Sequence, residues 1–438
     1  MDGLLVGSAS AMARAVARGE VGAEELLLAQ LARLAGVDAV VHAVVHLDAD
    51  GALRAARAAD AARVAGGVLG PLHGVPITVK DWIDVRGLPC SGGEVARLGR
   101  VPAADATAVA RLRAAGAIVL AKTNVGERSE AFGATLNPHD PTRTPTGSSS
   151  GEAALVAAAG SALGLGSDSG GSLRQPAHAC GCVALRPTTG RVPLTGHVPV
   201  ITPLLDPRTV IGPIARRVED LVIALSVLSG PDHVDPSVVP MPLGDPAEVD
   251  LRRLRVAWWD EQPDCDPTPD TRRTVAAAAG WLASAGAKVV PARPAGLERV
   301  YPLTRTYWSL PESDDGEVWV PTVTTDLDGA AVQRFRFEWD VFRSDMARFM
   351  GAFDAVLTPA AAWPAVRHGE PSGSIAPILT FSLTGQPAVV VPCGRDEDGM
   401  PIGVQVAARV GHDDVALALA AALEAAGGGW WLPAGVRA

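Results

Sequence analysis

Apolar residues recur at helical spacing in several stretches of this 438-residue chain, and these stretches predict its helices. The first, residues 8–35, is interrupted near Gly19 and Gly22 and predicts a pair of helices. Asp105 is available as the N-cap of a later helix that runs through Ala115 and is closed by Gly116. Further helices are predicted over 52–65, 152–160, 216–229, 268–285 and 412–426.

Short continuous apolar runs lie between these helices and predict buried strands. The run from Val75 to Val79 ends at Lys80, and the other predicted strands cover 117–120, 254–258, 287–290, 355–358, 388–392 and 402–407. Alternation of helix and strand is typical of an α/β protein. Because no repeat or linker divides the sequence, a single large domain over 1–438 is the simplest assignment.

The longest uncharged stretch, residues 371–394, contains Pro377, Pro387, Pro392 and Gly385, so we expect buried strands with turns there and not a membrane helix. The chain begins Met1-Asp2-Gly3 and shows no basic segment followed by an apolar one. These observations predict a cytoplasmic protein that does not bind membranes.

Composition narrows the function classes. Hydrophobic residues make up 48% and charged residues 20% of the chain, as in ordinary globular proteins. The formal net charge is −10 with both signs interleaved, which argues against the basic stripe of a nucleic-acid-binding protein. The cysteines are irregularly spaced and predict buried free thiols and no disulfide framework; they are Cys90, Cys180, Cys182, Cys265 and Cys393.

Two loops rich in serine and glycine flank one predicted helix and carry the candidate chemistry. They span residues 147–151 (GSSSG) and 168–174 (DSGGSLR). Consecutive backbone N–H groups in such turns can converge on an anion. A serine at the end of the turn could attack a carbonyl whose oxygen is held by those N–H groups, which is what acyl transfer requires. The serine also needs a base that removes its proton.

Three interpretations of these loops compete. The segment 147–151 matches a G-x-S-x-G nucleophile elbow centred on Ser149, but the proline-rich residues before it cannot form the strand that an elbow needs. A phosphate-binding loop would need a lysine directly after its glycines, and none is present. Lys80 is the remaining base, provided that burial lowers its pKa, although a lysine after a strand is usually exposed. Among the histidines, His178 is the first alternative base.

Three motifs together resemble those of the amidase signature family of serine hydrolases. Residues 71–81 (PLHGVPITVKD) resemble its lysine motif, 146–154 (TGSSSGEAA) its serine- and glycine-rich signature, and 163–177 (LGLGSDSGGSLRQPA) its nucleophile motif. Ser148 and Ser172 are 24 positions apart, the same offset as in the family. Further matches lie at 181–188, 212–216, 384–388 and 403–405. The resemblance covers most of the chain and is densest in a core of about 71–216.

This resemblance implies a central mixed β-sheet flanked by α-helices and an amidase that cleaves linear amides through an acyl-enzyme. Ser172 would be the nucleophile, Ser148 a bridging serine preceded by a cis peptide bond, and Lys80 the neutral terminal base. Backbone N–H groups of the nucleophile loop would form the oxyanion hole, at Ser169, Gly170, Gly171 and Ser172. The expected supporting residues are Ser149, Asp168 and Arg174. We expect no metal and no other cofactor, because these groups supply the nucleophilic, proton-transfer and electrostatic roles.

The chain departs from the family pattern at Thr146 and Ser150, where glycines are commoner. Its substrate would be a small-molecule amide, and residues 295–345, which hold many of the aromatic side chains, are either a pocket wall or core. The main alternative is the glutaminase (A-type) subunit of a tRNA-dependent amidotransferase, for which the chain looks short. A non-catalytic relative is a further alternative, and a homodimer is left open.

Overall fold

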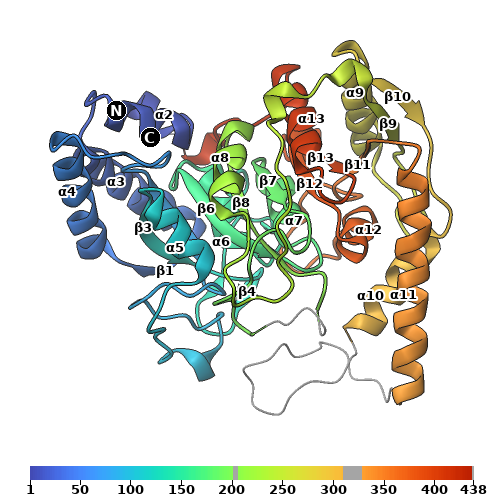
Figure 1. Ribbon diagram of the computed structural model, residues 1–438, viewed down its shortest axis with the longest axis horizontal. Helices are drawn as coiled ribbons and strands as arrows, with labels where there is room; N and C mark the ends of the chain where they lie inside the picture. Colours follow the sequence, from blue (N-terminus) through green and yellow to red (C-terminus); the bar gives the residue numbers. More distant parts are fainter. Residues whose placement is uncertain (201–205, 309–327, 437–438) are drawn as a thin grey trace.

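The computed structural model describes residues 1–200, 206–308 and 328–436, and these residues are organised around one mixed sheet (Figure 1). Its eleven described strands lie in the order β1-β3-β2-β6-β8-β7-β12-β13-β11-β9-β10. The strands are β1 (Val44–Leu47), β2 (Pro76–Lys80), β3 (Ile118–Thr123), β6 (Leu163–Asp168), β7 (Val183–Arg186), β8 (Val210–Ala215), β9 (Arg255–Trp258), β10 (Lys288–Pro291), β11 (Ala355–Pro359), β12 (Ala388–Arg395) and β13 (Pro401–Ala408). A separate short pair is formed by β4 (Arg128–Ser129) and β5 (Gly133–Ala134).

Helices cover both faces of this sheet, so the predicted fold class is confirmed. The first face carries α4 (Ala49–Val64), α5 (Thr107–Ala114), α8 (Val218–Leu228), α9 (Pro269–Ser284) and α13 (Asp413–Ala425). The second face carries α6 (Ser150–Ala157), α7 (Arg174–Cys180), α10 (Val300–Tyr307), α11 (Gly329–Met350) and α12 (Ala376–Thr384). The N-terminal helices α1 (Asp2–Leu5), α2 (Ala9–Ala17) and α3 (Ala23–Val41) lie at one end of the molecule (Figure 1).

The prediction of strands throughout 371–394 was wrong, because a helix, α12, occupies Ala376–Thr384 before strand β12 begins. Pro377 lies in the first turn of α12, where its missing N–H removes no helical bond. Gly385 ends the helix with a left-handed φ of 74°. Every residue of α12 is buried, so its sequence lacks the polar face that reveals a surface helix.

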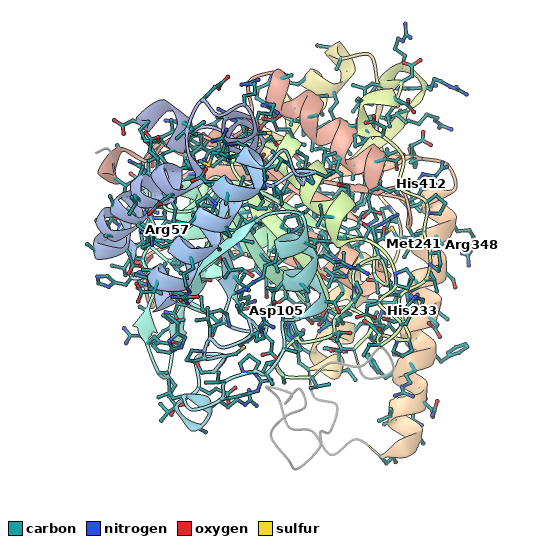
Figure 2. The ribbon with its side chains drawn as sticks, turned by 60° about the vertical axis from the view of Figure 1, so that its left-hand side comes forward. Arg57, Asp105, His233, Met241, Arg348 and His412 are labelled. Atoms are coloured by element: carbon teal, nitrogen blue, oxygen red, sulfur yellow. The ribbon has the colours of Figure 1, made fainter. Side chains whose placement is uncertain are left out.

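Asp105 does not cap α5 as predicted. The N-cap is Ala106, which provides no side-chain cap. Asp105 is labelled in Figure 2. Its carboxylate instead accepts a hydrogen bond from the backbone N–H of Arg86 at 2.8 Å and lies 3.6 Å from the guanidinium of Arg113. A residue that suits a helix cap also suits a loop-to-loop contact, and only the packing of the 86–105 loop decides between them.

The aromatic segment 295–345 contributes mainly core in its described part. Tyr307, Phe335, Trp339 and Phe342 are buried in one apolar cluster beneath α12, whereas Phe337 is 70% exposed. Trp319 lies outside the described residues. Cys90, Cys180, Cys182 and Cys265 are buried free thiols as predicted, and Cys393 is half-buried. In the described part of the chain, no helix is both long and apolar enough to cross a membrane.

The sheet brings the two signature loops to one edge. Strands β2 and β6 are neighbours and run parallel, so their carboxyl ends meet there. Lys80 ends β2 and Asp168 ends β6, directly before the loop to Ser172. Strand β8 is antiparallel to β6, so its amino end, after Asp206 and Arg208, lies at the same edge. Topology therefore assembles residues that are far apart in the sequence.

Candidate active site

Lys80 is fully buried at the end of β2 and contacts the second signature motif directly. Its Nζ lies 2.6 Å from the Ser148 hydroxyl oxygen and 3.2 Å from that of Ser167. The face of Trp82 covers it at 4.2 Å. Burial lowers the pKa of Lys80 to about 7, although the carboxylate of Asp168 opposes this. A neutral amine then has two N–H donors, for Ser167 and the Trp82 ring, and one lone pair that can accept the proton of Ser148.

A hydrogen-bonded chain behind Lys80 fixes the direction of its protons. The Nδ1 atom of His197 is 3.1 Å from the Pro199 carbonyl oxygen, which can only accept, so Nδ1 carries the proton. Nε2, at 3.1 Å from the Ser167 hydroxyl, is then an acceptor. Ser167 therefore donates to His197 and accepts from Lys80. Burial lowers the pKa of His197 to about 4, so the ring stays neutral and keeps this arrangement.

The Ser148 loop has an unusual backbone, and this accounts for its sequence. The Gly147–Ser148 peptide bond is cis, as the resemblance implies. Thr146 adopts a positive φ of 59°, which explains why glycine is commoner at this position. Ser150, the other departure, begins α6 and donates its hydroxyl to the Gly126 carbonyl at 2.5 Å. Both departures are thus accommodated without displacing Ser148 from Lys80.

Ser149 ties the two loops together. Its backbone N–H donates to the Ser172 carbonyl at 3.1 Å, and its hydroxyl donates to the Ser167 carbonyl at 3.2 Å. The side chain is fully buried. Ser149 is therefore placed for support and not for attack on a substrate, which disfavours the elbow interpretation of 147–151.

The nucleophile loop leaves several backbone donors unused. The N–H of Gly171 donates to the Asp168 carboxylate at 2.9 Å, so this predicted oxyanion donor already has a partner. No group in the described part of the chain accepts a hydrogen bond from the N–H of Ser169, Gly170 or Ser172. Gly171 has a φ of 107°, which an L-residue with a side chain rarely adopts. The unused N–H groups are the donors that a developing oxyanion would need.

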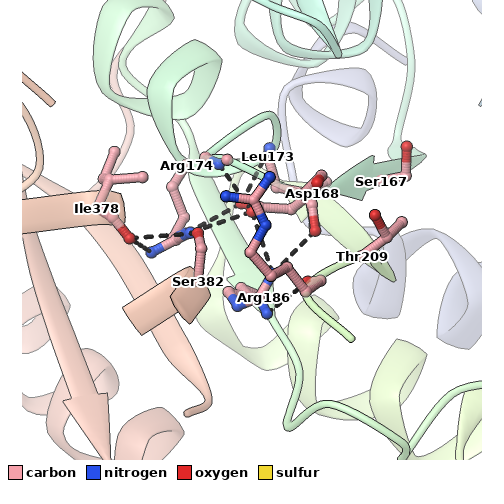
Figure 3. A network of polar contacts seen from close by, with 12 residues as sticks. Ser167, Asp168, Leu173, Arg174, Arg186, Thr209, Ile378 and Ser382 are labelled. Carbon is pink, nitrogen blue, oxygen red and sulfur yellow. Dashed lines mark hydrogen bonds and ion pairs between the residues drawn. The ribbon is translucent and has the colours of Figure 1, made fainter. Parts of the chain in front are cut away.

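A buried ionic network braces this loop (Figure 3). The Arg174 guanidinium binds both carboxylate oxygens of Asp168, at 2.9 and 3.0 Å, and also reaches Ile378 and Ser382. Arg186 donates to the Asp168 backbone carbonyl at 2.8 Å. Burial would raise the pKa of Asp168, but the two guanidinium groups hold it well below its usual range. Asp168 and Arg174 were both predicted as supporting residues, whereas Arg186 was missed because it lies on a different strand.

Glu152 is a buried carboxyl group beneath Lys80 that sequence analysis did not single out. Burial raises its pKa to about 8. The Thr78 hydroxyl lies 2.6 Å from Glu152 and 3.0 Å from Ser161, whose own hydroxyl donates to the Leu163 carbonyl. One hydroxyl cannot donate to both neighbours. A protonated Glu152 that donates to Thr78 satisfies every member of this chain, while Thr123 donates to its other oxygen at 2.7 Å.

Other candidates are excluded from the site by their contacts. His178, the alternative base, accepts from the Gly403 N–H at 2.9 Å and lies 3.0 Å from the Trp363 carbonyl, so both ring nitrogens have backbone partners. In the described ranges, no group of three or more histidine, cysteine, aspartate or glutamate side chains could hold a metal ion. Ser167 and His197 were missed as site residues; Ser167 lies within the quoted motif 163–177, whereas no local pattern singles out His197.

The chain is similar in sequence and in fold to several known proteins. The family model described as Amidase matches residues 25–315 and 324–417. The A subunit of glutamyl-tRNA(Gln) amidotransferase from Salinispora arenicola is 35% identical, with 98% of each chain covered. The structure of 6-aminohexanoate cyclic dimer hydrolase superposes with a TM-score of 0.87 at 28% identity, covering 99% of this chain and 100% of that one. A bacterial aryl acylamidase of the amidase signature family shares the fold, with a TM-score of 0.85 at 23% identity over 96% of both chains.

Proposed function

This chain belongs to the amidase signature family, and from this premise we propose that it hydrolyses a carboxamide through an acyl-enzyme on Ser172. It is an amidase-family C–N hydrolase. The proposal concerns the residues that perform the reaction and the amide that they cleave. Ser172 is the nucleophile, Ser148 relays its proton, and Lys80 is the terminal base.

In the first step the Ser172 oxygen attacks the amide carbon and forms a C–O bond. Its proton passes to Ser148, while the Ser148 proton passes to neutral Lys80. The carbonyl electrons move onto oxygen, and the N–H groups of Ser169, Gly170 and Ser172 stabilise the oxyanion. When this intermediate collapses, the C–N bond breaks and the leaving nitrogen takes a proton back through Ser148. Water then repeats the sequence on the ester and releases the acid and free Ser172.

The single observation that carries this proposal is that Lys80 is buried, has a lowered pKa and contacts Ser148. A base must be unprotonated near its working pH and must reach the proton it removes. Lys80 meets the first condition through a pKa of about 7 and the second through its 2.6 Å contact with Ser148. The chain from Ser167 to His197 adds a fixed orientation of the amine. A merely structural lysine would need a carboxylate partner, and Lys80 has no ion pair with any described residue.

Of the two kinds of amidase considered from the sequence, the comparisons favour the glutaminase subunit. The Salinispora A subunit matches at 35% identity over 98% of its length, so the length of this chain does not argue against that role. The 6-aminohexanoate hydrolase, an enzyme named for its own amide, is less similar at 28%. We therefore propose glutamine as the first amide to test, with an independent amidase as the second candidate.

The predicted absence of a nucleic-acid partner conflicts in part with this proposal, because the name of the A-subunit relatives includes glutamyl-tRNA(Gln). A glutaminase subunit would supply ammonia to partner chains, and its own pocket would bind only glutamine. The net charge of −10 fits a chain that does not itself bind the tRNA. A cytoplasmic location and a homodimer stay predictions.

Ammonia release by the purified chain tests the proposal. Glutamine and a panel of neutral amides are supplied to the wild type and to Ser172→Ala, and ammonia is measured for each. Release from glutamine that is lost in Ser172→Ala supports a glutaminase, and partner chains that co-purify support the subunit role. Release only from neutral amides supports the independent amidase. Equal release by the wild type and Ser172→Ala refutes the proposed nucleophile.

A further inference from the structure

The guanidinium of Arg208 differs from those of the other buried arginines in having no hydrogen-bond partner among the described residues. Five arginines are fully buried in the described ranges, and four of them use both terminal guanidinium nitrogens as donors; these four are Arg174, Arg186, Arg191 and Arg216. None of the three guanidinium nitrogens of Arg208 finds an acceptor in the described chain. A buried, charged donor left without an acceptor is costly, so a ligand that supplies one would be bound favourably.

Arg208 lies beside the nucleophile loop because β8 runs antiparallel to β6. Two residues before it, Asp206 accepts a hydrogen bond from the Ser169 hydroxyl at 3.2 Å. The Arg208 guanidinium stacks on Tyr307, 3.4 Å from the ring centroid, and lies 5.7 Å from that of Trp308. Trp308 in turn packs on Gly170, where an added Cβ would lie 3.1 Å from the indole. Only the Trp308 side chain thus separates the Arg208 guanidinium from Gly170 of the candidate oxyanion hole.

Asp206 does not satisfy this guanidinium. Its nearest carboxylate oxygen is 3.9 Å from the Arg208 Nε, beyond hydrogen-bond distance. Both Asp206 oxygens already accept other hydrogen bonds, from the backbone of Arg208 and from Thr209 and Ser169. Asp206 therefore offsets part of the charge of Arg208 but leaves its donors free.

A second unpaired donor lies beside the first. The Tyr307 hydroxyl is buried beside Asp206 and Arg208 and makes no hydrogen bond of standard geometry with a described residue. Burial raises its pKa, so the hydroxyl keeps its proton and can donate. A guanidinium fork and the phenol ring on which it stacks together suit an anionic, planar acceptor. A carboxylate has this shape and charge.

We propose that Arg208 and Tyr307 bind a free carboxylate of the substrate, so that the preferred substrates are amides that also carry a carboxylate. The inference rests on the proposed amidase function and narrows its substrate class. Glutamine belongs to this class, as do the monoamides of dicarboxylic acids. The carboxylate is held by Arg208 while the amide carbon is attacked by Ser172.

Matched substrates test this specificity. Glutaric acid monoamide and glutaramide have the same length and both release ammonia, but only the monoamide carries a carboxylate. The wild type should prefer the monoamide in kcat/KM by about 10- to 100-fold, the range of a hydrogen-bonded charged pair. In Arg208→Met this preference should disappear, and in Arg208→Lys it should be intermediate because the fork is lost while the charge remains. Tyr307→Phe keeps the stacked ring and should lower the preference about fivefold.

Arg217→Met is the matched control, because Arg217 follows the opposite end of the same strand, β8. It should keep both the activity and the preference. Fluorophosphonate labelling of Ser172 separates the carboxylate site from the amidase function. If Arg208→Met is labelled but has lost the preference for the monoamide, the carboxylate site is supported. If the wild type resists labelling and cleaves neither amide, the amidase function is refuted.

A binding measurement decides the carboxylate site independently of catalysis. Glutarate is titrated calorimetrically into Ser172→Ala and into the same protein with Arg208→Met. Binding that weakens at least tenfold with Arg208→Met supports the site. Equal affinity, or a wild type that hydrolyses both amides equally well, would overturn it and make Arg208 a structural residue of the Tyr307 stack.

Discussion

Replacing Lys80 by methionine should abolish activity and at the same time make the protein more stable at neutral pH. Methionine fills a similar apolar volume but removes both the base and the buried amine. The loss of a general base lowers kcat/KM by about 10²- to 10⁴-fold. Burial lowers the pKa of Lys80 from 10.5 to about 7, which corresponds to about 5 kcal/mol at about 1.4 kcal/mol per pKa unit.

The sign of this effect follows from proton binding. Between pH 7 and 10.5 the unfolded chain holds a proton on this lysine and the folded protein does not, so stability rises with pH in this window. Below pH 7 the penalty for burying the amine is fully present. Lys80→Met lacks the penalty, so its advantage over the wild type should shrink by about 4 kcal/mol from pH 6 to pH 10.

Urea denaturation of both proteins at several pH values measures this difference directly, since every other titrating group is shared. In parallel, the wild-type kcat/KM should be lost as the pH falls through about 7, because the reaction needs neutral Lys80. Lys80→Arg should be inactive, since arginine stays charged. A stability difference that is constant with pH, or substantial activity in Lys80→Arg, would refute the assignment of Lys80 as a neutral base.

Further predictions concern the serines, the buried carboxyl group and metals. Ser172→Ala should lower amide hydrolysis by several orders of magnitude with an unchanged melting temperature, and Ser148→Ala should cost more activity than Ser149→Ala; the reverse order would restore the elbow interpretation. Glu152→Gln should match the wild type in stability near pH 4 and gain on it as the pH rises from about 4.5 to about 8, because in this window the carboxyl of the unfolded chain ionises while that of the folded protein keeps its proton. Glu152→Ala should lose about 1–3 kcal/mol in the same denaturation assay, since Thr78 and Thr123 lose their partner. Chelator treatment should leave the rate unchanged, and a loss that added zinc restores would contradict a mechanism without metal.

Local patterns along the chain predicted only part of the frame of the site: the strands β2 and β3 and the helix α6 were expected, whereas β6, β7, β8 and α7 were not. An apolar run such as Val75 to Val79 favours a buried strand wherever it lies in the fold. Lys80 is placed at the end of that strand simply because it is the next residue in the sequence. The resemblance of the serine- and glycine-rich motifs to those of the amidase signature family identified Ser148 and Ser172 as candidates. Periodicity failed at α12, because a helix buried on every side has no polar face to reveal it.

Only the tertiary structure decided which ionisable side chains are neutral and which hydrogen-bond donors lack an acceptor. The pKa of Lys80 depends on burial by Trp82 and on the chain through Ser167 to His197, and the contacts of these residues cross different strands. The unpaired guanidinium of Arg208 exists because β8 is antiparallel to β6 and α10 places Tyr307 on it. Desolvation and hydrogen bonding act over a few ångströms in space, whatever the distance along the chain. The sequence therefore identified the chemical groups, whereas the fold determined their protonation states and the groups that they contact.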